Sequence, residues 1–79
     1  MDENELQIIR EAFARVLRQK RNELGLSQEE LGFRAGIAMR YVSLLETGKR
    51  QPTLSTLASI SKSLNITLSE FVTEIEAQR

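Results

Sequence analysis

Apolar residues recur every three or four positions along nearly the whole chain, which is the spacing of amphipathic α-helices. In the first part of the chain this spacing predicts an amphipathic helix of about 18 residues. Gly25 follows the last apolar position and is expected to end this helix in the left-handed conformation. No alternation typical of β-strands and no internal repeat occurs. The apolar positions of the first helix are Leu6, Ile9, Phe13, Val16, Leu17 and Leu24.

A capping box marks the start of a second, shorter helix. Ser27 can accept a hydrogen bond from a backbone amide of the first turn, and Glu30 can reach back to the amide of Ser27. The helix is expected to run to about Ala35 and to end at Gly36. Gly32 within it lowers helix stability by roughly 0.5–1 kcal/mol relative to alanine. We therefore expect another stretch of backbone to pack closely against Gly32.

Three further helices are expected in the rest of the chain. A third helix covers about Met39–Thr47 and is stopped by Gly48. Thr53 can cap a fourth helix, and a second capping box, Thr67 with Glu70, can start a fifth. The fold class is therefore all-α, a compact five-helix bundle in a single domain over residues 1–79. The apolar side is Leu54, Leu57, Ala58, Ile60 and Leu64 in the fourth helix, and Leu68, Phe71, Val72 and Ile75 in the fifth.

The composition limits the classes of function. A chain of 79 residues with 41% hydrophobic residues forms one small core. It contains no cysteine and no histidine, so disulfides, zinc sites built on those residues and histidine-based triads are excluded. We expect no enzyme, no metal or cofactor and no small-molecule ligand. The polar start MDENELQ is not a signal peptide, and no apolar stretch approaches the ~20 residues of a membrane span, so we expect a soluble, cytoplasmic protein.

The charges are unevenly distributed, although the net charge is zero. Residues 15–50 carry eight basic and four acidic side chains, a net charge of +4, and the two ends together carry −4. Such a dipolar chain can offer one basic face to phosphates, although a mixed solvated surface has the same composition.

The turn Gly36-Ile37-Ala38 joins the second and third helices in the manner of a helix-turn-helix, at about residues 27–47. Val42 and Leu45 are three residues apart and are expected to face the core. At about 100° per residue, the opposite side of the third helix then contains no acid. A face without carboxylates can lie in a major groove between phosphates. This outward face consists of Met39, Arg40, Ser43, Leu44 and Thr47.

The outward side chains suit the edges of bases. Arg40 can donate two hydrogen bonds to guanine, Met39 and Leu44 can contact a thymine methyl group, and Ser43 can bond to base edges or phosphate. We predict that these four residues read bases in double-stranded DNA.

Neighbouring residues are predicted to contact the phosphates. Gln28 begins the second helix, where free amides and the helix dipole favour an anion. Lys49 and Arg50 follow the third helix and can bind phosphates on its flank. Tyr41 either packs at the edge of the third helix or bonds a phosphate, and Thr47 joins the same phosphate set.

Taken together, these residues resemble the phage-repressor/Cro (XRE) family. Its pattern G-x-S/T-Q-x-x-L, followed by I-x-x-x-E-x-G-x-x-x-P, is matched within Lys20–Leu31, Gly36–Ile37 and Val42–Thr53, with valine at the isoleucine position. The resemblance spans about residues 13–71. It implies a lambda-repressor-like bundle that binds DNA sequence-specifically and regulates transcription.

The family pattern also implies roles for two charged residues. Arg21 is expected to pair with Glu46 as a structural anchor and to lie near a phosphate. Ala38 departs from the family, because a capping serine, threonine or aspartate is common there; the missing cap should cost the third helix about 0.5–2 kcal/mol.

The fifth helix, at about residues 67–77, carries more apolar surface than a core of this size requires. We predict a homodimer on a palindromic operator, held by a self-complementary patch. The alternative is that the same side chains only complete the monomer core. The predicted interface residues are Leu68, Phe71, Val72 and Ile75.

Several biological roles fit a bare domain of this kind. Its length and the run Arg40-Tyr41-Val42-Ser43 resemble the controller proteins of restriction–modification systems. A phage repressor or Cro and the antitoxin of a toxin–antitoxin pair remain open. From another class of function, the bundle can be a protein-interaction module that binds a partner protein.

Overall fold

The computed structural model describes residues 1–79 and consists of five α-helices joined by short loops. The expected all-α, five-helix fold is confirmed. None of the helices combines the length and the hydropathy that a membrane crossing needs. The helices are α1 (Glu3–Glu23), α2 (Gln28–Ala35), α3 (Met39–Glu46), α4 (Leu54–Ser63) and α5 (Leu68–Ala77).

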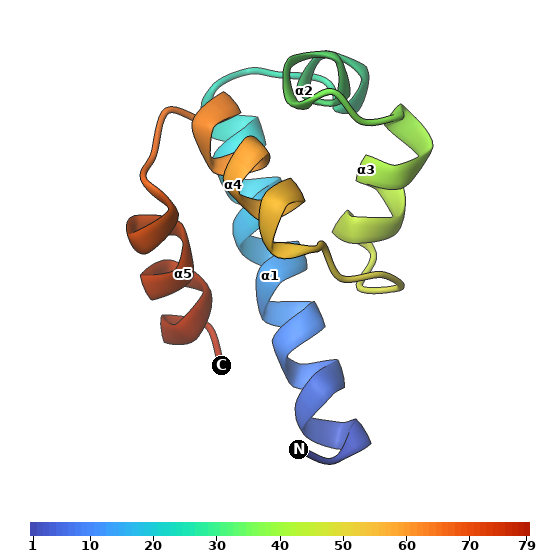
Figure 1. Ribbon diagram of the computed structural model, residues 1–79, viewed down its shortest axis with the longest axis vertical. Coiled ribbons are helices and arrows are strands. Elements are labelled where there is room, and N and C mark those ends of the chain that lie inside the picture. Colours follow the sequence, from blue (N-terminus) through green and yellow to red (C-terminus); the bar gives the residue numbers. More distant parts are fainter.

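The long helix α1 forms the axis of the molecule (Figure 1). α3 packs against one side of α1 and α5 against another, while α2 lies across the top and contacts both α3 and α4. The helix-turn-helix is therefore held on a frame made by the other three helices. α2 and α3 have only eight residues each and cannot bury enough apolar surface alone.

The core takes side chains from every helix. Leu17, Leu45 and Phe71 are each 0% exposed. The rings of Phe13 and Phe71 lie 5.7 Å apart between centroids and join α1 to α5. The other members of the core cluster are Val16, Leu26, Leu31, Ala35, Val42, Ile60 and Leu64.

The first helix begins earlier than its first apolar position, and Gly25 follows its end in the left-handed conformation with φ 69°, as expected. Asp2 caps it by accepting a hydrogen bond from the Glu5 amide at 2.8 Å, so α1 has 21 residues. Leu24 follows the helix as its C-cap and is 44% exposed, so its assignment to the apolar stripe is wrong. The helix ends one residue too early for Leu24 to share the buried face.

One of the two predicted capping boxes forms completely. At α5, Thr67 Oγ1 accepts from the Glu70 amide, and the Thr67 amide donates to Glu70 at 2.9 Å. At α2, Ser27 accepts from the Glu30 amide at 2.9 Å, but the carboxylate of Glu30 instead pairs with Arg34, one helical turn on. The second half of the box at Ser27 is thus replaced by an ion pair within the helix.

The apolar side of α4 is narrower than expected. Ile60 and Leu64 are buried and Leu57 is half-buried, whereas Ala58 is exposed and Leu54 is 74% exposed. Ala58 lies about 100° around the helix from Leu57 and so falls outside the stripe. Leu54 is the first residue of the helix.

Candidate nucleic-acid interface

The turn between α2 and α3 is tight because α2 has a glycine where the turn approaches it. A Cβ atom on Gly32 would lie 2.7 Å from the carbonyl oxygen of Ile37. The Ile37 amide donates to Gly32 O at 2.9 Å, and Gly36 adopts the left-handed conformation with φ 73°. The expected close approach of backbone to Gly32 is therefore present. It fixes the position of α3 relative to α2.

α3 presents a basic face without acids to the solvent. Val42 and Leu45 are fully buried, as their spacing predicts, and the one acid of the helix, Glu46, is only 2% exposed. Arg40 is exposed and takes part in none of the ion pairs of the structure. Its charge is therefore not neutralised by a carboxylate of the same chain.

The other outward residues of α3 differ in exposure. Met39 is 52% exposed and Thr47 is exposed, whereas Ser43 and Leu44 are half-buried. Tyr41 is half-buried and packs against the core cluster. The accessible part of the face therefore centres on the first turn of α3, around Met39 and Arg40.

The carboxylate of Glu46 joins three helices. Arg21 donates to both of its oxygens, from Nε to Oε2 at 2.6 Å and from Nη2 to Oε1 at 2.9 Å. Gln28 Nε2 donates to Oε1 at 3.1 Å. The Arg21–Glu46 contact that the resemblance implies is thus present. Burial without such partners would be costly, and here the buried carboxylate accepts hydrogen bonds from both α1 and α2.

Arginine side chains of α1 also bind backbone carbonyls near this carboxylate. Arg21 Nη1 donates to Leu26 O at 2.8 Å, and Arg18 Nη1 donates to the carbonyl oxygen of Glu46. The hydrogen bonds to the Glu46 side chain raise the pKa of the Arg21 guanidinium. Sequence reasoning missed the role of Arg18. Its signal was the spacing of three residues from Arg21, which places both on one face of α1.

The side chain of Gln28 is held by one hydrogen bond and keeps further hydrogen-bonding groups free. One of the two N–H groups of its amide is directed at Glu46, which leaves the other N–H and the amide oxygen available. Ser27 Oγ accepts a hydrogen bond from the Glu30 amide, so the amides that remain free at the N-terminus of α2 are those of Gln28 and Glu29.

The segment after α3 is basic and accessible. Gly48 ends the helix in the left-handed conformation with φ 73°, and Lys49 and Arg50 are exposed. The hydroxyl of Thr47 donates back to the helix, toward Ser43 O at 3.0 Å. A phosphate contact by Thr47 would therefore require its hydroxyl hydrogen to change partner.

The four side chains of α5 predicted at a dimer interface divide into two groups. Phe71 is 0% exposed, and its assignment to the interface is corrected because its ring is enclosed in the monomer core against Phe13. Val72 is 44% exposed, and Leu68 and Ile75 are half-buried. Val72 and Ile75 line an open, mainly apolar pocket of about 250 Å³ between α1, α5 and the loop before α4.

Comparison with known proteins agrees with this geometry. The family model described as Helix-turn-helix matches residues 17–71. An uncharacterised HTH-type transcriptional regulator of Sinorhizobium fredii, y4dJ, is 43% identical over 61 residues, which are 77% of this chain and 74% of y4dJ. The control protein C.MunI of a Mycoplasma species is 39% identical over 67 residues, 84% of this chain and 90% of C.MunI.

The solved structures show the same likeness. The restriction–modification controller protein C.AhdI of Aeromonas hydrophila superposes with a TM-score of 0.76 at 34% identity, over 78% of this chain and 94% of C.AhdI. The family match covers α2, α3 and α4 completely, including the Arg21–Glu46 contact and the tight turn at Gly32. The chain therefore belongs to the helix-turn-helix family of transcriptional regulators.

Proposed function

We propose that the protein binds double-stranded DNA sequence-specifically, as a homodimer on a palindromic operator, and so regulates transcription. One observation carries the proposal: the outward face of α3 holds an unpaired Arg40 and no acid, while Glu46 fixes the same helix to α1 and α2. A rigid helix with an acid-free face fits the major groove, where carboxylates would be repelled by phosphates.

Arg40 is proposed to be the main base-reading residue, because a guanidinium can donate two hydrogen bonds to guanine. Met39 and Leu44 are assigned to thymine methyl groups and Ser43 to a base edge. Since Ser43 and Leu44 are half-buried, they contribute only from their exposed edges, and part of the specificity then comes from DNA shape.

The phosphates are assigned to residues that surround this helix. Gln28 offers its free N–H at the start of α2, and Lys49 and Arg50 flank the end of α3. Arg21, which is paired with Glu46, is assigned to the same set because it lies on the carboxylate that Gln28 also contacts. Thr47 and Tyr41 complete the proposed set from α3 and its C-cap.

Dimerisation is assigned to the exposed part of the α5 surface, with Leu68, Val72 and Ile75 and without Phe71. A C2 dimer needs one patch that pairs with its own copy, and the exposed Val72 beside an apolar pocket supports this surface as the candidate. Such a dimer would place two α3 helices on two half-sites about one helical turn apart. The protein would act in the bacterial cytoplasm, where its operator is.

The likeness to C.MunI and C.AhdI supports a role as a controller of a restriction–modification system. Neighbouring genes for a methyltransferase and an endonuclease would support this role. A neighbouring toxin gene would favour an antitoxin instead.

Selection from random duplex DNA, followed by footprinting, tests the function. We expect a palindromic site, and we expect Arg40→Ala to weaken binding by about 1–3 kcal/mol, roughly 5- to 150-fold, with loss of preference at one base position. The matched control is Arg34→Ala, an exposed arginine of α2 that already pairs with Glu30. If Arg40→Ala retains the affinity and the sequence preference of the wild type, the base-reading proposal is wrong and the protein-interaction module becomes the better hypothesis.

A further inference from the structure

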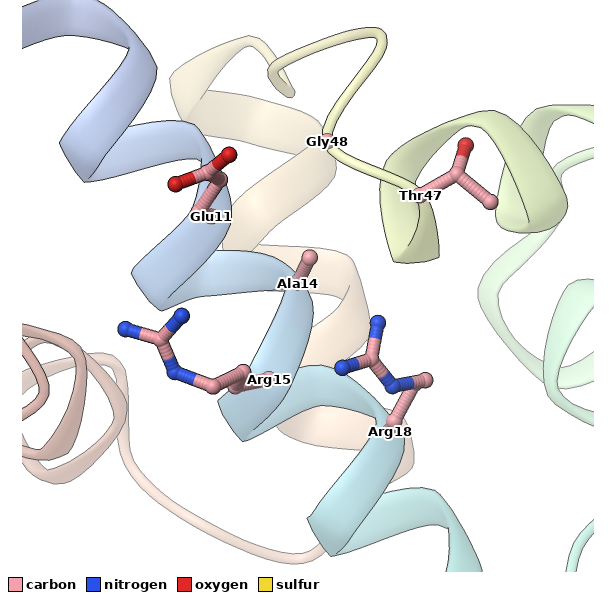
Figure 2. A pocket seen from close by; sticks show the side chains of 6 residues that line it. All are labelled: Glu11, Ala14, Arg15, Arg18, Thr47 and Gly48. Carbon is pink, nitrogen blue, oxygen red and sulfur yellow. The ribbon is translucent and has the colours of Figure 1, made fainter.

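An open pocket of about 330 Å³ lies between α1 and the C-terminal end of α3, and its two arginines are outside the set of residues predicted to contact DNA. Figure 2 shows Arg18 pointing toward the end of α3 that carries Thr47, with Arg15 on the neighbouring turn of α1. The pocket is lined by Glu11, Ala14, Arg15, Arg18, Thr47 and Gly48.

The two arginines keep their charge un-neutralised. All the ion pairs of the structure use Lys20, Arg21 or Arg34, and none uses the arginines of the pocket. Arg15 Nη2 instead donates to Gln78 O at 2.9 Å, and Arg18 donates to the Glu46 carbonyl oxygen. These neutral acceptors position the side chains but remove none of the charge. Each guanidinium has five N–H donors, so most of its donors remain for a ligand.

The rest of the pocket permits an anion. Glu11 is its one acid; the Glu11 carboxylate accepts from Gln7 Nε2 at 3.0 Å and pairs with neither arginine. The formal charge of the lining is therefore +1. Ala14 and Gly48 contribute almost no side-chain volume, so the arginines can be approached.

The end of α3 would by itself repel an anion, because the C-terminal carbonyls of a helix carry a partial negative charge. Arg18 offsets that charge by donating to Glu46 O. Thr47 and Gly48 of the pocket lead directly into Lys49 and Arg50. The pocket therefore adjoins, along the chain, the segment proposed to bind phosphates.

We propose that this pocket binds a backbone phosphate of the DNA duplex, beyond those contacted from Lys49 and Arg50. The inference rests on the proposed function, because it requires a duplex on the outer face of α3 with one strand passing the C-terminal end of that helix. Arg18, which points toward the end of α3, would bind this phosphate through charge-assisted hydrogen bonds. Arg15, whose guanidinium points away from Arg18 and donates to Gln78 O, would add positive charge beside it. Such a contact adds affinity for any DNA sequence and none for a particular base.

The test compares the salt dependence of DNA binding between two double variants. In Arg15→Gln/Arg18→Gln the slope of log K against log[salt] should become shallower by about 0.9 per chain for one lost phosphate contact. Affinity for the selected site and for unrelated duplexes should fall by the same factor. The control Arg34→Gln/Lys62→Gln removes the same charge from exposed positions of α2 and α4 and should keep the wild-type slope.

Arg15→Gln alone keeps the contact of Arg18 with α3. If the double variant does not fold, this single variant should make the slope shallower by less than about 0.9 per chain, because Arg18 remains. A wild-type slope in the pocket variant, or the same change in the control, overturns the inference. If Arg40→Ala still loses preference at one base position in that case, the proposed function stands and only the pocket assignment fails. A wild-type chain that binds no duplex contradicts both.

Titration with inorganic phosphate separates a free anion from the DNA backbone. The arginine Nε–H signals of ¹⁵N-labelled protein report binding in the pocket. A saturable shift that the double variant lacks, combined with an unchanged DNA salt slope, would assign the pocket to a free anion and overturn the DNA contact.

Discussion

Glu46 holds a buried negative charge that only Arg21 neutralises. Changing Arg21 leaves this carboxylate buried without an ionic partner, and changing Glu46 leaves the half-buried guanidinium of Arg21 without one. Glu46→Ala should lower the free energy of unfolding by about 3–5 kcal/mol, the usual cost of breaking a buried pair from one side. Urea unfolding measures this value. Glu29→Ala, an exposed acid on α2, is the matched control and should change the stability by less than about 0.5 kcal/mol.

The double variant Arg21→Ala/Glu46→Ala separates the pair from the rest of the network. Its loss of stability should be smaller than the sum of the two single losses, because neither charge is then left alone. Additive losses, or a Glu46→Ala variant as stable as the control, would show that the pair does not anchor α3.

The contacts around Glu46 show which roles of single residues the sequence predicts. The family pattern predicts the Arg21–Glu46 contact, because both residues are part of the motif. It does not predict the bond from Gln28 to the same carboxylate, or that of Arg18 to a backbone carbonyl. Those contacts depend on the distances between three helices, which periodicity does not determine.

At the scale of the element, α3 lacks a side-chain cap. Ala38 stands at the N-cap with φ −69° and ψ 147°, the extended conformation that a capping serine also adopts. Ala38→Ser should therefore raise the free energy of unfolding by about 1 kcal/mol. The control Ala58→Ser places the same change at an exposed position inside α4, where it should slightly destabilise. Urea unfolding of both variants checks this, and equal effects would contradict the capping argument.

The start of α5 makes a prediction about pH. Hydrogen bonds from the Thr67 backbone amide, then from its side chain, lower the pKa of Glu70 below its ordinary value of 4.5. In the unfolded chain Glu70 therefore binds its proton first on acidification. The stability that its carboxylate contributes is present above about pH 4.5 and is lost as the pH falls through the folded pKa.

Thermal unfolding between about pH 7 and pH 3 measures this contribution. Glu70→Gln should be less stable than wild type near neutral pH, and the difference should shrink on acidification. Glu76→Gln, at an exposed position in the last turn of the same helix, should not be less stable than wild type near neutral pH, because a carboxylate there opposes the helix dipole. A difference between wild type and Glu70→Gln that stays constant over this range would show that the capping carboxylate does not act through its charge.

Helices were predictable because their signals are local. Caps, left-handed glycines and apolar spacing gave all five, and the errors at Leu24, Leu54 and Ala58 lie at helix ends or at the edge of a stripe. The assignment of Phe71 to a dimer interface failed for another reason. The periodicity of a helix shows which face is apolar, but not whether its own core or a partner covers that face.

For the molecule as a whole, α5 is tied firmly to α1 while part of its apolar surface stays open. Lys20 Nζ lies 2.8 Å from Glu74 Oε1, and Arg15 donates to Gln78 O, so the helix is fixed at its C-terminal half. Glu74 raises the pKa of Lys20 above its ordinary value through this hydrogen bond. The ion pair is therefore lost only when the pH rises through the raised pKa of Lys20. A fixed helix with an exposed valine fits the proposed role of α5 as a surface for a second copy.

Val72→Asp tests that surface. Val72 is 44% exposed, so an aspartate can be solvated in the monomer but would be buried in the proposed dimer. We expect sedimentation at tens of micromolar to show a dimer for the wild type and a monomer for this variant, with operator affinity falling as the half-sites lose their link. Thr73→Asp adds the same charge at the next, exposed position and should remain dimeric. A wild-type chain that is a monomer would contradict the proposed dimer. A Val72→Asp dimer as tight as the control would place the contact between copies elsewhere. In both cases Arg40→Ala still tests the α3 face separately.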